Sequence, residues 1–503
     1  MADEKQDPVK AEEKPLNKHL IKYKDRNFSD KLWYIRQNIT VEPLLAGLII
    51  PSVISRFAMG NFNLDKACRV NFQFGDEICN ALVKKNSNNY TSYERQVQTL
   101  ISSIDIWRSV INTALPCIII MFLGAWSDRT GKRKLCILLP ISGEVTAVTG
   151  GWVTMFLGVF SYISDITSEQ SRTFRVGLVS FCMTAGVPIG IAMGGILVQK
   201  MGYYGLFTST TVLFSLVLMY GCFCLKEPES FLEEKGLPKI ERRCSGDVAF
   251  FDLTHVVDTI GVAFRRRAGG TRVKVILTLV AVFIIYGPAM SEHGVFYLFV
   301  RNQLNWDMVK YSVFASYSIV LHSIGAMFSI TILSKKLQID DSLLCLIAMS
   351  SKFVGAIWTT FVKTDLEMIL IPIVEFFSSA ILTSLRSIIS KLVEKDETAK
   401  VNSLFSLTET LASLVFHPLY SWLYMKTLQV LPGAVFLTSA ALIIPASIIL
   451  IFFFIQHRRA LSNSRRNALE AQEKKDAEAE KVLEKIPNCA VVVPPELTEK
   501  TKL

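Results

Sequence analysis

The chain has little charge for its length of 503 residues. Only 19% of the residues are Asp, Glu, Lys or Arg, half are hydrophobic, and the mean hydropathy is positive at +0.36. An ordinary soluble domain has about 25% charged residues. The composition therefore argues against a soluble globular protein and predicts a multi-pass membrane protein.

The sequence also lacks the patterns that hold phosphates, metals or catalytic nucleophiles. We find no glycine-rich phosphate loop, no paired Cys or His at metal-ligand spacing and no nucleophile elbow. Six of the ten cysteines fall within apolar segments, where packing is their expected role. We therefore expect no enzyme, no cofactor, no metal site and no ATP-hydrolysing domain.

A cleavable signal peptide is missing as well. Residues 1–39 are rich in Lys, Asp and Glu and contain no apolar core, so they are expected to form a cytoplasmic tail. The net charge of +10 comes from cations in loops and tails. The positive-inside rule places such cations on the cytoplasmic side, so a nucleic-acid polymer is not an expected partner.

Long apolar stretches are abundant. A helix needs about 20 residues to cross a hydrocarbon core of about 30 Å. Lipid leaves no backbone group unpaired, and few stretches alternate as strands do, so we expect an all-α membrane protein. The eleven stretches are 41–60, 104–126, 135–163, 175–199, 205–225, 274–298, 310–333, 341–362, 366–389, 399–423 and 431–455.

A polar segment divides these stretches into two groups. Residues 226–273 are expected to be a cytoplasmic linker between an N-terminal bundle, 40–225, and a C-terminal bundle, 274–456. Residues 457–503 are rich in Ala, Glu and Lys and are expected to form a cytoplasmic tail.

A second long polar segment, 61–103, lies within the first bundle and is expected to be an extracytoplasmic loop. It contains the sequon Asn89-Tyr90-Thr91 and two cysteines, Cys68 and Cys79. On that side of the membrane, a glycan on Asn89 and a disulfide between the two cysteines both become possible.

A basic run follows the second apolar stretch and resembles the loop signature of the major facilitator superfamily of transporters. Its signature residues are Gly124, Asp128, Arg129, Gly131, Lys132 and Arg133. In that family the loop joins helices 2 and 3 on the cytoplasmic side, and its carboxylate caps a helix of the other half, which helps to hold the cytoplasmic gate shut. A helix N-terminus suits this role because its free N–H groups and partial positive charge attract a carboxylate.

Three further segments resemble one branch of that superfamily, the solute carrier family 46 branch that includes the proton-coupled folate transporter. They are Thr40-Val41-Glu42-Pro43, the run from Asp165 to Arg175, and the run from Leu385 to Val393. The resemblance covers nearly all of 40–455. It implies two six-helix halves that hold a substrate between them and expose it alternately to each side of the membrane.

The resemblance implies a secondary transporter of small organic anions, because the wider family handles folates, cyclic dinucleotides and small peptidoglycan fragments. Protons are the candidate coupling ion, and the plasma membrane or an endolysosomal membrane is the expected location. Where the folate carrier has a proton-coupling glutamate, this chain has Ser180, so strict folate–proton symport does not follow. The alternative is a transporter-shaped sensor or scaffold, or an inactive shortened variant.

The chain is one apolar stretch short of the twelve helices of the family. The stretch 135–163 resembles the start of helix 3 joined near Gly150-Gly151 to the end of helix 4. The basic segments on either side, 127–134 and 226–273, should both be cytoplasmic, which requires an even number of crossings between them. Either 135–163 is a shallow hairpin with legs of about 21 Å, or it crosses once; the hairpin keeps the charges correctly placed.

Ionisable residues inside the apolar stretches are the candidate functional groups, since a charge at bilayer depth is costly unless it serves transport or finds a partner. Glu292 with His293, and Glu409 with His417, are the leading candidates for proton transfer; structural hydrogen bonding is the alternative for each histidine. Arg386 and Lys352 could bind an anionic substrate, or could instead pair with Asp128, a lipid headgroup or a neighbouring helix. The full set is Glu144, Glu292, His293, His322, Lys352, Glu375, Arg386, Glu409 and His417.

Overall fold

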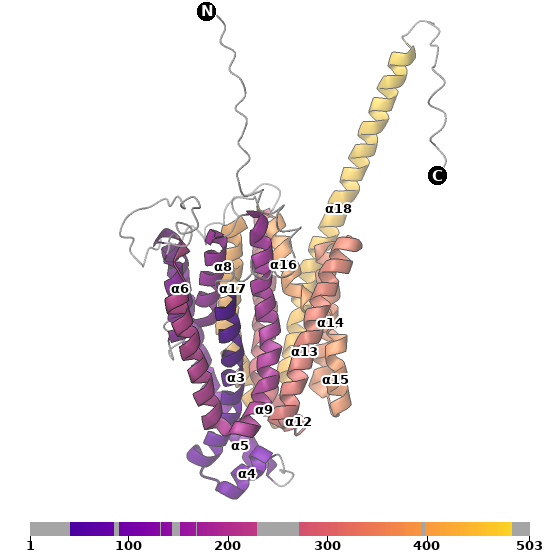
Figure 1. Cartoon of the computed structure of the whole chain (residues 1–503). Coiled ribbons are helices and arrows are strands. Elements are labelled where there is room, and N and C mark those ends of the chain that lie inside the picture. The colour runs from indigo at the N-terminus through magenta and orange to yellow at the C-terminus, as the bar shows by residue number, and fades with distance from the viewer. Residues whose placement is uncertain are drawn as a thin grey trace, which may run out of the picture.

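The computed structural model describes residues 41–84, 90–130, 132–142, 151–166, 169–228, 271–393 and 398–484. Nearly all of these residues are helical, none of them is in a strand, and the helices run side by side as one long bundle (Figure 1). Six of the described helices are long and apolar enough to cross a membrane. Asn89, Gly131, Glu144, and most of the tails and the linker lie outside the described residues.

The described part of the first half forms two long helices, α3 and α5, three short ones, α4, α6 and α8, and a bent helix, α9, with two limbs. The α9 limbs correspond to the predicted stretches 175–199 and 205–225, and they meet at Gly202, whose φ of 68° suits a residue without a side chain. The elements are α3 (Glu42–Lys66), continued by the π-helical turn η1 (Ala67–Asn71), α4 (Asp76–Lys84), α5 (Thr91–Thr130), α6 (Arg133–Ser142), α8 (Gly151–Ile166) and α9 (Glu169–Cys224).

The second half begins after the linker and ends in a helix that continues far beyond the bundle (Figure 1). Its elements are α12 (Thr271–Gln303), α13 (Met308–Phe328), continued by the π-helical turn η3 (Ser329–Lys336), α14 (Asp341–Phe361), α15 (Asp365–Val374), α16 (Ala380–Lys391), α17 (Thr398–Thr427) and α18 (Ala434–Glu484).

The predicted single helix over 366–389 is wrong, because the structure breaks it after Val374. Pro372 lies in the last turn of α15 and cannot donate a backbone hydrogen bond, which favours an end to the helix there. Gly355 of α14 faces the break, and a Cβ at that position would lie 2.2 Å from Glu375 Cγ. The break and the glycine together let the Glu375 side chain reach the interior of the second half.

The predicted loop over 61–103 is also wrong in part, because most of it is helical. The helix α3 and its π turn continue to Asn71, α4 occupies Asp76–Lys84, and α5 begins at Thr91. Helices can extend beyond the apolar stretch because their backbone hydrogen bonds are internal and remain satisfied in water. A disulfide joins Cys68 to Cys79 and ties α4 to the turn η1 that continues α3.

The helices α6 and α8 form a hairpin within the first half. Arg133 Nε, at the start of α6, lies 2.9 Å from Asp165 Oδ2, at the end of α8, and a Cβ on Gly158 would lie 3.0 Å from Ile137 Cγ1. The chain therefore returns to the end from which it started. The described parts of the two legs contain 10 and 16 residues, or about 15 and 24 Å of helix, and residues 143–150 between them lie outside the described residues. This geometry favours the hairpin over a single crossing.

A cysteine substituted for Asp165 is therefore expected to stay unlabelled by a membrane-impermeant thiol reagent applied outside intact cells. The hairpin returns this residue to the end that carries the basic run, which the positive-inside rule makes cytoplasmic. Asn80→Cys is the positive control, because Asn80 is an exposed residue of α4 and should be labelled strongly from outside. Labelling of both positions from outside would reject the hairpin.

The apolar core shows at which end the two halves are packed together. At the end that carries α4, one cluster contains residues of both halves, including Leu64, Val97, Phe299 and Tyr424. Two other clusters are each confined to a single half. We predict that the end with α4 and the disulfide is extracytoplasmic and use that name for it; there the halves are closed against each other.

Candidate transport site and gate

Arg301 joins the two halves at the extracytoplasmic end. Its guanidinium donates from Nε to Glu94 Oε1 at 2.8 Å and from Nη2 to the Leu82 carbonyl at 2.6 Å. The Tyr297 hydroxyl donates to Asn61 Oδ1 at 2.9 Å. Only 4% of the Arg301 side chain and 6% of the Glu94 side chain are exposed. We call Arg301, Glu94, Asn61, Tyr297 and the Leu82 carbonyl the extracytoplasmic latch.

The latch residues are not among the candidates predicted from the sequence. Arg301 lies just beyond the stretch 274–298, and Asn61 and Glu94 lie in the segment taken for a loop. A usable signal was the spacing of Glu94, Gln98 and Ile101, which places them on one face of a helix that continues into the membrane. Gln98 supports the latch by accepting a hydrogen bond of 2.9 Å from the Tyr424 hydroxyl.

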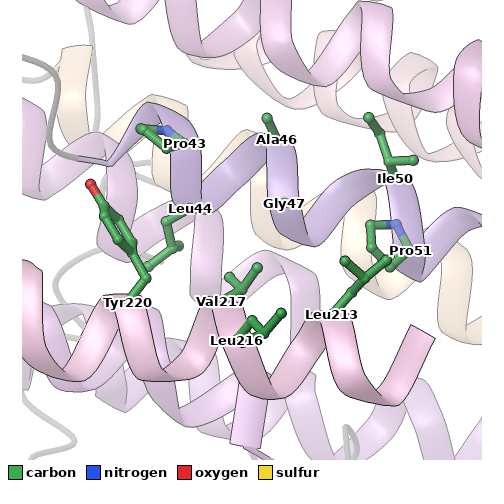
Figure 2. A pocket seen from close by; sticks show the side chains of 10 residues that line it. All are labelled: Pro43, Leu44, Ala46, Gly47, Ile50, Pro51, Leu213, Leu216, Val217 and Tyr220. Atoms are coloured by element: carbon green, nitrogen blue, oxygen red, sulfur yellow. The ribbon is translucent and has the colours of Figure 1, made fainter. Parts of the chain in front are cut away.

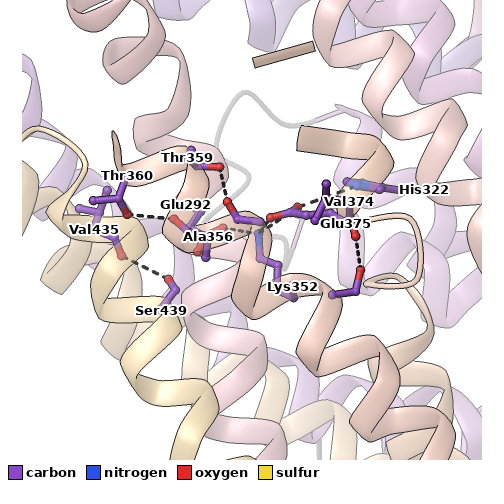
Figure 3. A network of polar contacts seen from close by, with 12 residues as sticks. Glu292, His322, Lys352, Ala356, Thr359, Thr360, Val374, Glu375, Val435 and Ser439 are labelled. Atoms are coloured by element: carbon purple, nitrogen blue, oxygen red, sulfur yellow. Dashed lines mark hydrogen bonds and ion pairs between the residues drawn. The ribbon is translucent and has the colours of Figure 1, made fainter. Parts of the chain in front are cut away.

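Four ionisable side chains meet inside the second half at mid-bundle depth. Lys352 Nζ donates to Glu292 Oε2 at 2.9 Å and to Glu375 Oε1 at 3.2 Å. His322 Nε2 lies 3.9 Å from Glu375 Oε2. Figure 3 shows Glu292, Lys352, Glu375 and His322 pointing toward one another, Glu375 from the break after α15 and the others from three separate helices. We call these four residues the buried charge cluster.

The predicted carboxylate–histidine pairs are not the contacts that the structure contains. Glu292 binds Lys352 rather than its neighbour His293, and Glu409 binds Arg386 rather than His417. His417 Nδ1 lies 3.0 Å from the Ser413 carbonyl and 3.2 Å from Ser291 Oγ. A lysine or arginine keeps its charge at neutral pH and is therefore a stronger partner for a carboxylate than a neutral histidine.

Of the two predicted anion-binding cations, Arg386 is more accessible than Lys352. Its Nη2 lies 3.1 and 3.0 Å from the two carboxylate oxygens of Glu409, and its guanidinium carbon lies 4.6 Å above the Phe405 ring. Nearly half of the Arg386 side chain is exposed, against 17% for Glu409. An exposed face on a fixed guanidinium can accept a second anion, so Arg386 is the leading candidate for substrate contact.

The first half contributes charges of its own. Glu42 and Arg175, both in segments that resemble the folate carrier branch, form a pair of 3.0 Å between the starts of α3 and α9. Asp105 and Arg108 lie within the predicted stretch 104–126 but were missed, although their depth alone marks them as candidates; Asp105 Oδ1 is 3.9 Å from Arg108 Nη1.

The gating motif is described only in part. Gly124, Asp128 and Arg129 lie in the last turns of α5, but their side chains are outside the described set, as is Gly131. Lys132 is exposed, and Arg133 is buried against Asp165 in the hairpin. Capping of another helix by Asp128 therefore stays a prediction.

A separate cavity of about 350 Å³ lies between the first turns of α3 and the second limb of α9 (Figure 2). Its ten lining residues include Pro43, Gly47, Leu216 and Tyr220, and none of them is a predicted site residue. Its walls are apolar apart from the Tyr220 hydroxyl, so they offer no cation to an anionic substrate.

Comparison with known proteins agrees with this architecture. Residues 98–417 match the description "Major Facilitator Superfamily". The chain belongs to the major facilitator superfamily. The inward-open xylose transporter XylE from E. coli has the same fold, with a TM-score of 0.52 at 13% identity over 82% of this chain and 95% of that one.

Two curated members of the superfamily are similar over most of their length. The probable peptidoglycan muropeptide transporter SLC46 of Drosophila melanogaster is 22% identical over 436 residues, which cover 78% of this chain and 81% of that protein. The proton-coupled folate transporter of Rattus norvegicus is 23% identical over 71% of this chain and 80% of its own length. This superfamily member is therefore a multi-pass secondary transporter of the plasma or endolysosomal membrane, not an enzyme.

Proposed function

We propose that the chain moves small organic anions across the membrane by alternating access of its two halves, with Arg386 in contact with the substrate. The observation that carries the proposal is the contrast between the two ends. The halves are latched through Arg301 in the last turn of α12, whereas Arg386, within α16 and outside the latch, is half exposed. That combination suits a state that is open to the cytoplasm.

The substrate class follows from the groups in place and from the relatives. A guanidinium binds a carboxylate or phosphate through two parallel hydrogen bonds, and Phe405 holds the Arg386 plane in position. The relatives are described as transporters of folate and of peptidoglycan muropeptides. Folates, muropeptides and cyclic dinucleotides are thus the anions to test first.

Protons are the proposed coupling ion, because the second half holds buried carboxylates and histidines at mid-bundle depth. Asp128 is proposed to cap the first turn of α17, near Thr398, when the cytoplasmic side closes. Proton coupling and the capping by Asp128 both require the two halves to move relative to each other.

Uptake into proteoliposomes tests the proposal. The full chain is reconstituted and given radiolabelled folate, a cyclic dinucleotide and a muropeptide, with and without an inward proton gradient. We expect gradient-dependent accumulation of at least one of these anions over protein-free vesicles. If none of them accumulates under either condition, the transport proposal fails.

The second candidate function is a transporter-shaped sensor or scaffold. The short α6–α8 hairpin favours it, because the hairpin replaces two full membrane helices of the superfamily. A sensor would bind one of the three anions saturably without accumulating it inside the vesicles.

A further inference from the structure

The buried charge cluster contains one negative charge more than its cation can balance. Lys352 is shared between Glu292 and Glu375, while His322, the fourth member, is neutral in its ordinary state. The two carboxylate side chains are only 6% and 8% exposed. An unbalanced charge at that depth is costly, so the cluster favours binding one positive charge.

The hydrogen bonds identify the atom at which that charge is least compensated. Both oxygens of Glu375 accept from Lys352, at 3.2 and 3.3 Å. Glu292 accepts from Lys352 through Oε2 only, and its buried Oε1 has no hydrogen-bond partner among the described residues. A neutral carboxyl pays a smaller penalty than a carboxylate for such an oxygen.

The helices around Glu292 supply the remaining titratable groups. His293 follows it on α12, His322 belongs to α13, and His417 belongs to α17 and is bound to Ser291 and Ser413. The Tyr420 hydroxyl, also on α17, is bound to Ser439 of α18 at 2.7 Å. The His322 side chain is 24% exposed and is the most exposed group of the cluster, although its Nε2, which faces Glu375, is buried.

We propose that Glu292 is the residue that carries the coupling proton, which binds at Oε1 while Lys352 stays paired with Glu375. The proposal rests on the transport function above and deepens it. Protonation removes the charge that ties α12 to Lys352 of α14, and release of the proton restores the shared ion pair. Since α12 also carries Arg301, the proton on Glu292 acts on the same helix that latches the two halves.

A transport experiment separates coupling from movement of the substrate. In Glu292→Gln the side chain keeps its shape and stays permanently neutral, so the halves can still exchange substrate. Proteoliposomes are given the three labelled anions named above, and the one that wild type accumulates best is used. Gradient-driven accumulation should fall at least tenfold, while counterflow against the same unlabelled anion stays within about twofold.

Glu367→Gln is the matched control, because Glu367 lies at the start of α15, away from the cluster, and its carboxylate accepts a hydrogen bond of 2.8 Å from the Lys363 backbone N–H. It should accumulate the anion as wild type does. Retained gradient-driven accumulation in Glu292→Gln would overturn the proposal, as would a sodium gradient that drives wild-type uptake at constant pH.

An infrared measurement tests the proton site without any substrate. At neutral pH, wild type in lipid should show a protonated-carboxyl band that Glu292→Gln lacks and Glu367→Gln retains. A band that persists in Glu292→Gln would overturn the assignment. If wild type accumulates none of the anions but the band behaves as expected, the transport function fails and the proton site stands.

Discussion

The Arg301→Met variant is expected to open the extracytoplasmic end of the bundle. Methionine removes the guanidinium that binds Glu94 and the Leu82 carbonyl, and it leaves the Glu94 carboxylate buried without its cation. Breaking a buried ion pair in this way costs about 3–5 kcal/mol. Because the cost falls on the closed state alone, the population of the open state should rise by about a hundredfold or more.

Labelling from the outside measures this change. Ser102 is 1% exposed and lies one turn beyond Gln98 on α5, so a cysteine there is shielded while the latch is closed. In a background that keeps only the Cys68–Cys79 disulfide, Ser102→Cys should react with an impermeant thiol reagent only when Arg301→Met is also present. Arg69→Met is the matched control, because Arg69 is a partly exposed arginine of the extracytoplasmic end and pairs with Asp65. Equal labelling with and without Arg301→Met would show that Arg301 is not a latch.

The Arg386→Ala variant is expected to lose nearly all anion uptake. Its guanidinium is fixed by Glu409 and by the Phe405 ring, and its free edge is the proposed contact for the substrate. Hydrogen bonds to charged groups contribute about 1.5–3 kcal/mol each, so the loss of two should raise KM by a hundredfold or more. Arg386→Lys keeps the charge but cannot form parallel hydrogen bonds, and should fall between wild type and Arg386→Ala.

Arg458→Ala is the control for this substitution. Arg458 also lies over a phenylalanine ring, 5.9 Å from the centroid of Phe454, but it is exposed on the part of α18 near the end of the bundle. It should transport as wild type does. A wild-type KM in Arg386→Ala, with normal yield and melting temperature, would remove Arg386 from the substrate site.

Hydropathy predicted the helices because lipid imposes the same requirement on each span, namely internal hydrogen bonds over a fixed thickness. It did not predict where helices extend into water, as α3 and α5 do, since polar residues there can belong to a loop or to a helix. It also missed the break at Glu375, which depends on Gly355 of a different helix.

For the candidate site, too, the sequence predicted single residues but not the contacts between them. Depth in the membrane marked Glu292, Lys352, Glu375 and Arg386 one by one, because each is costly at that position. Their partners depend on how helices far apart in sequence pack, so neighbours such as His293 were chosen instead of Lys352. The latch was missed because its residues lie at the ends of the apolar stretches, where a charge is not costly by itself.

Relative movement of the two halves is the central claim, and a cross-link between them tests it most directly. A Cβ on Gly195 of α9 would lie 3.0 Å from Ser312 Cβ of α13, so a small outward shift of the two helices would bring the pair to the separation of about 3.5–4.5 Å that a disulfide needs. In a background without free cysteines, oxidised Gly195→Cys/Ser312→Cys should lose accumulation of the anion that wild type takes up. Reductant should restore it, and wild type and each single variant should be unaffected by the same treatments. Uptake at the wild-type rate by the fully cross-linked protein would contradict alternating access at this seam.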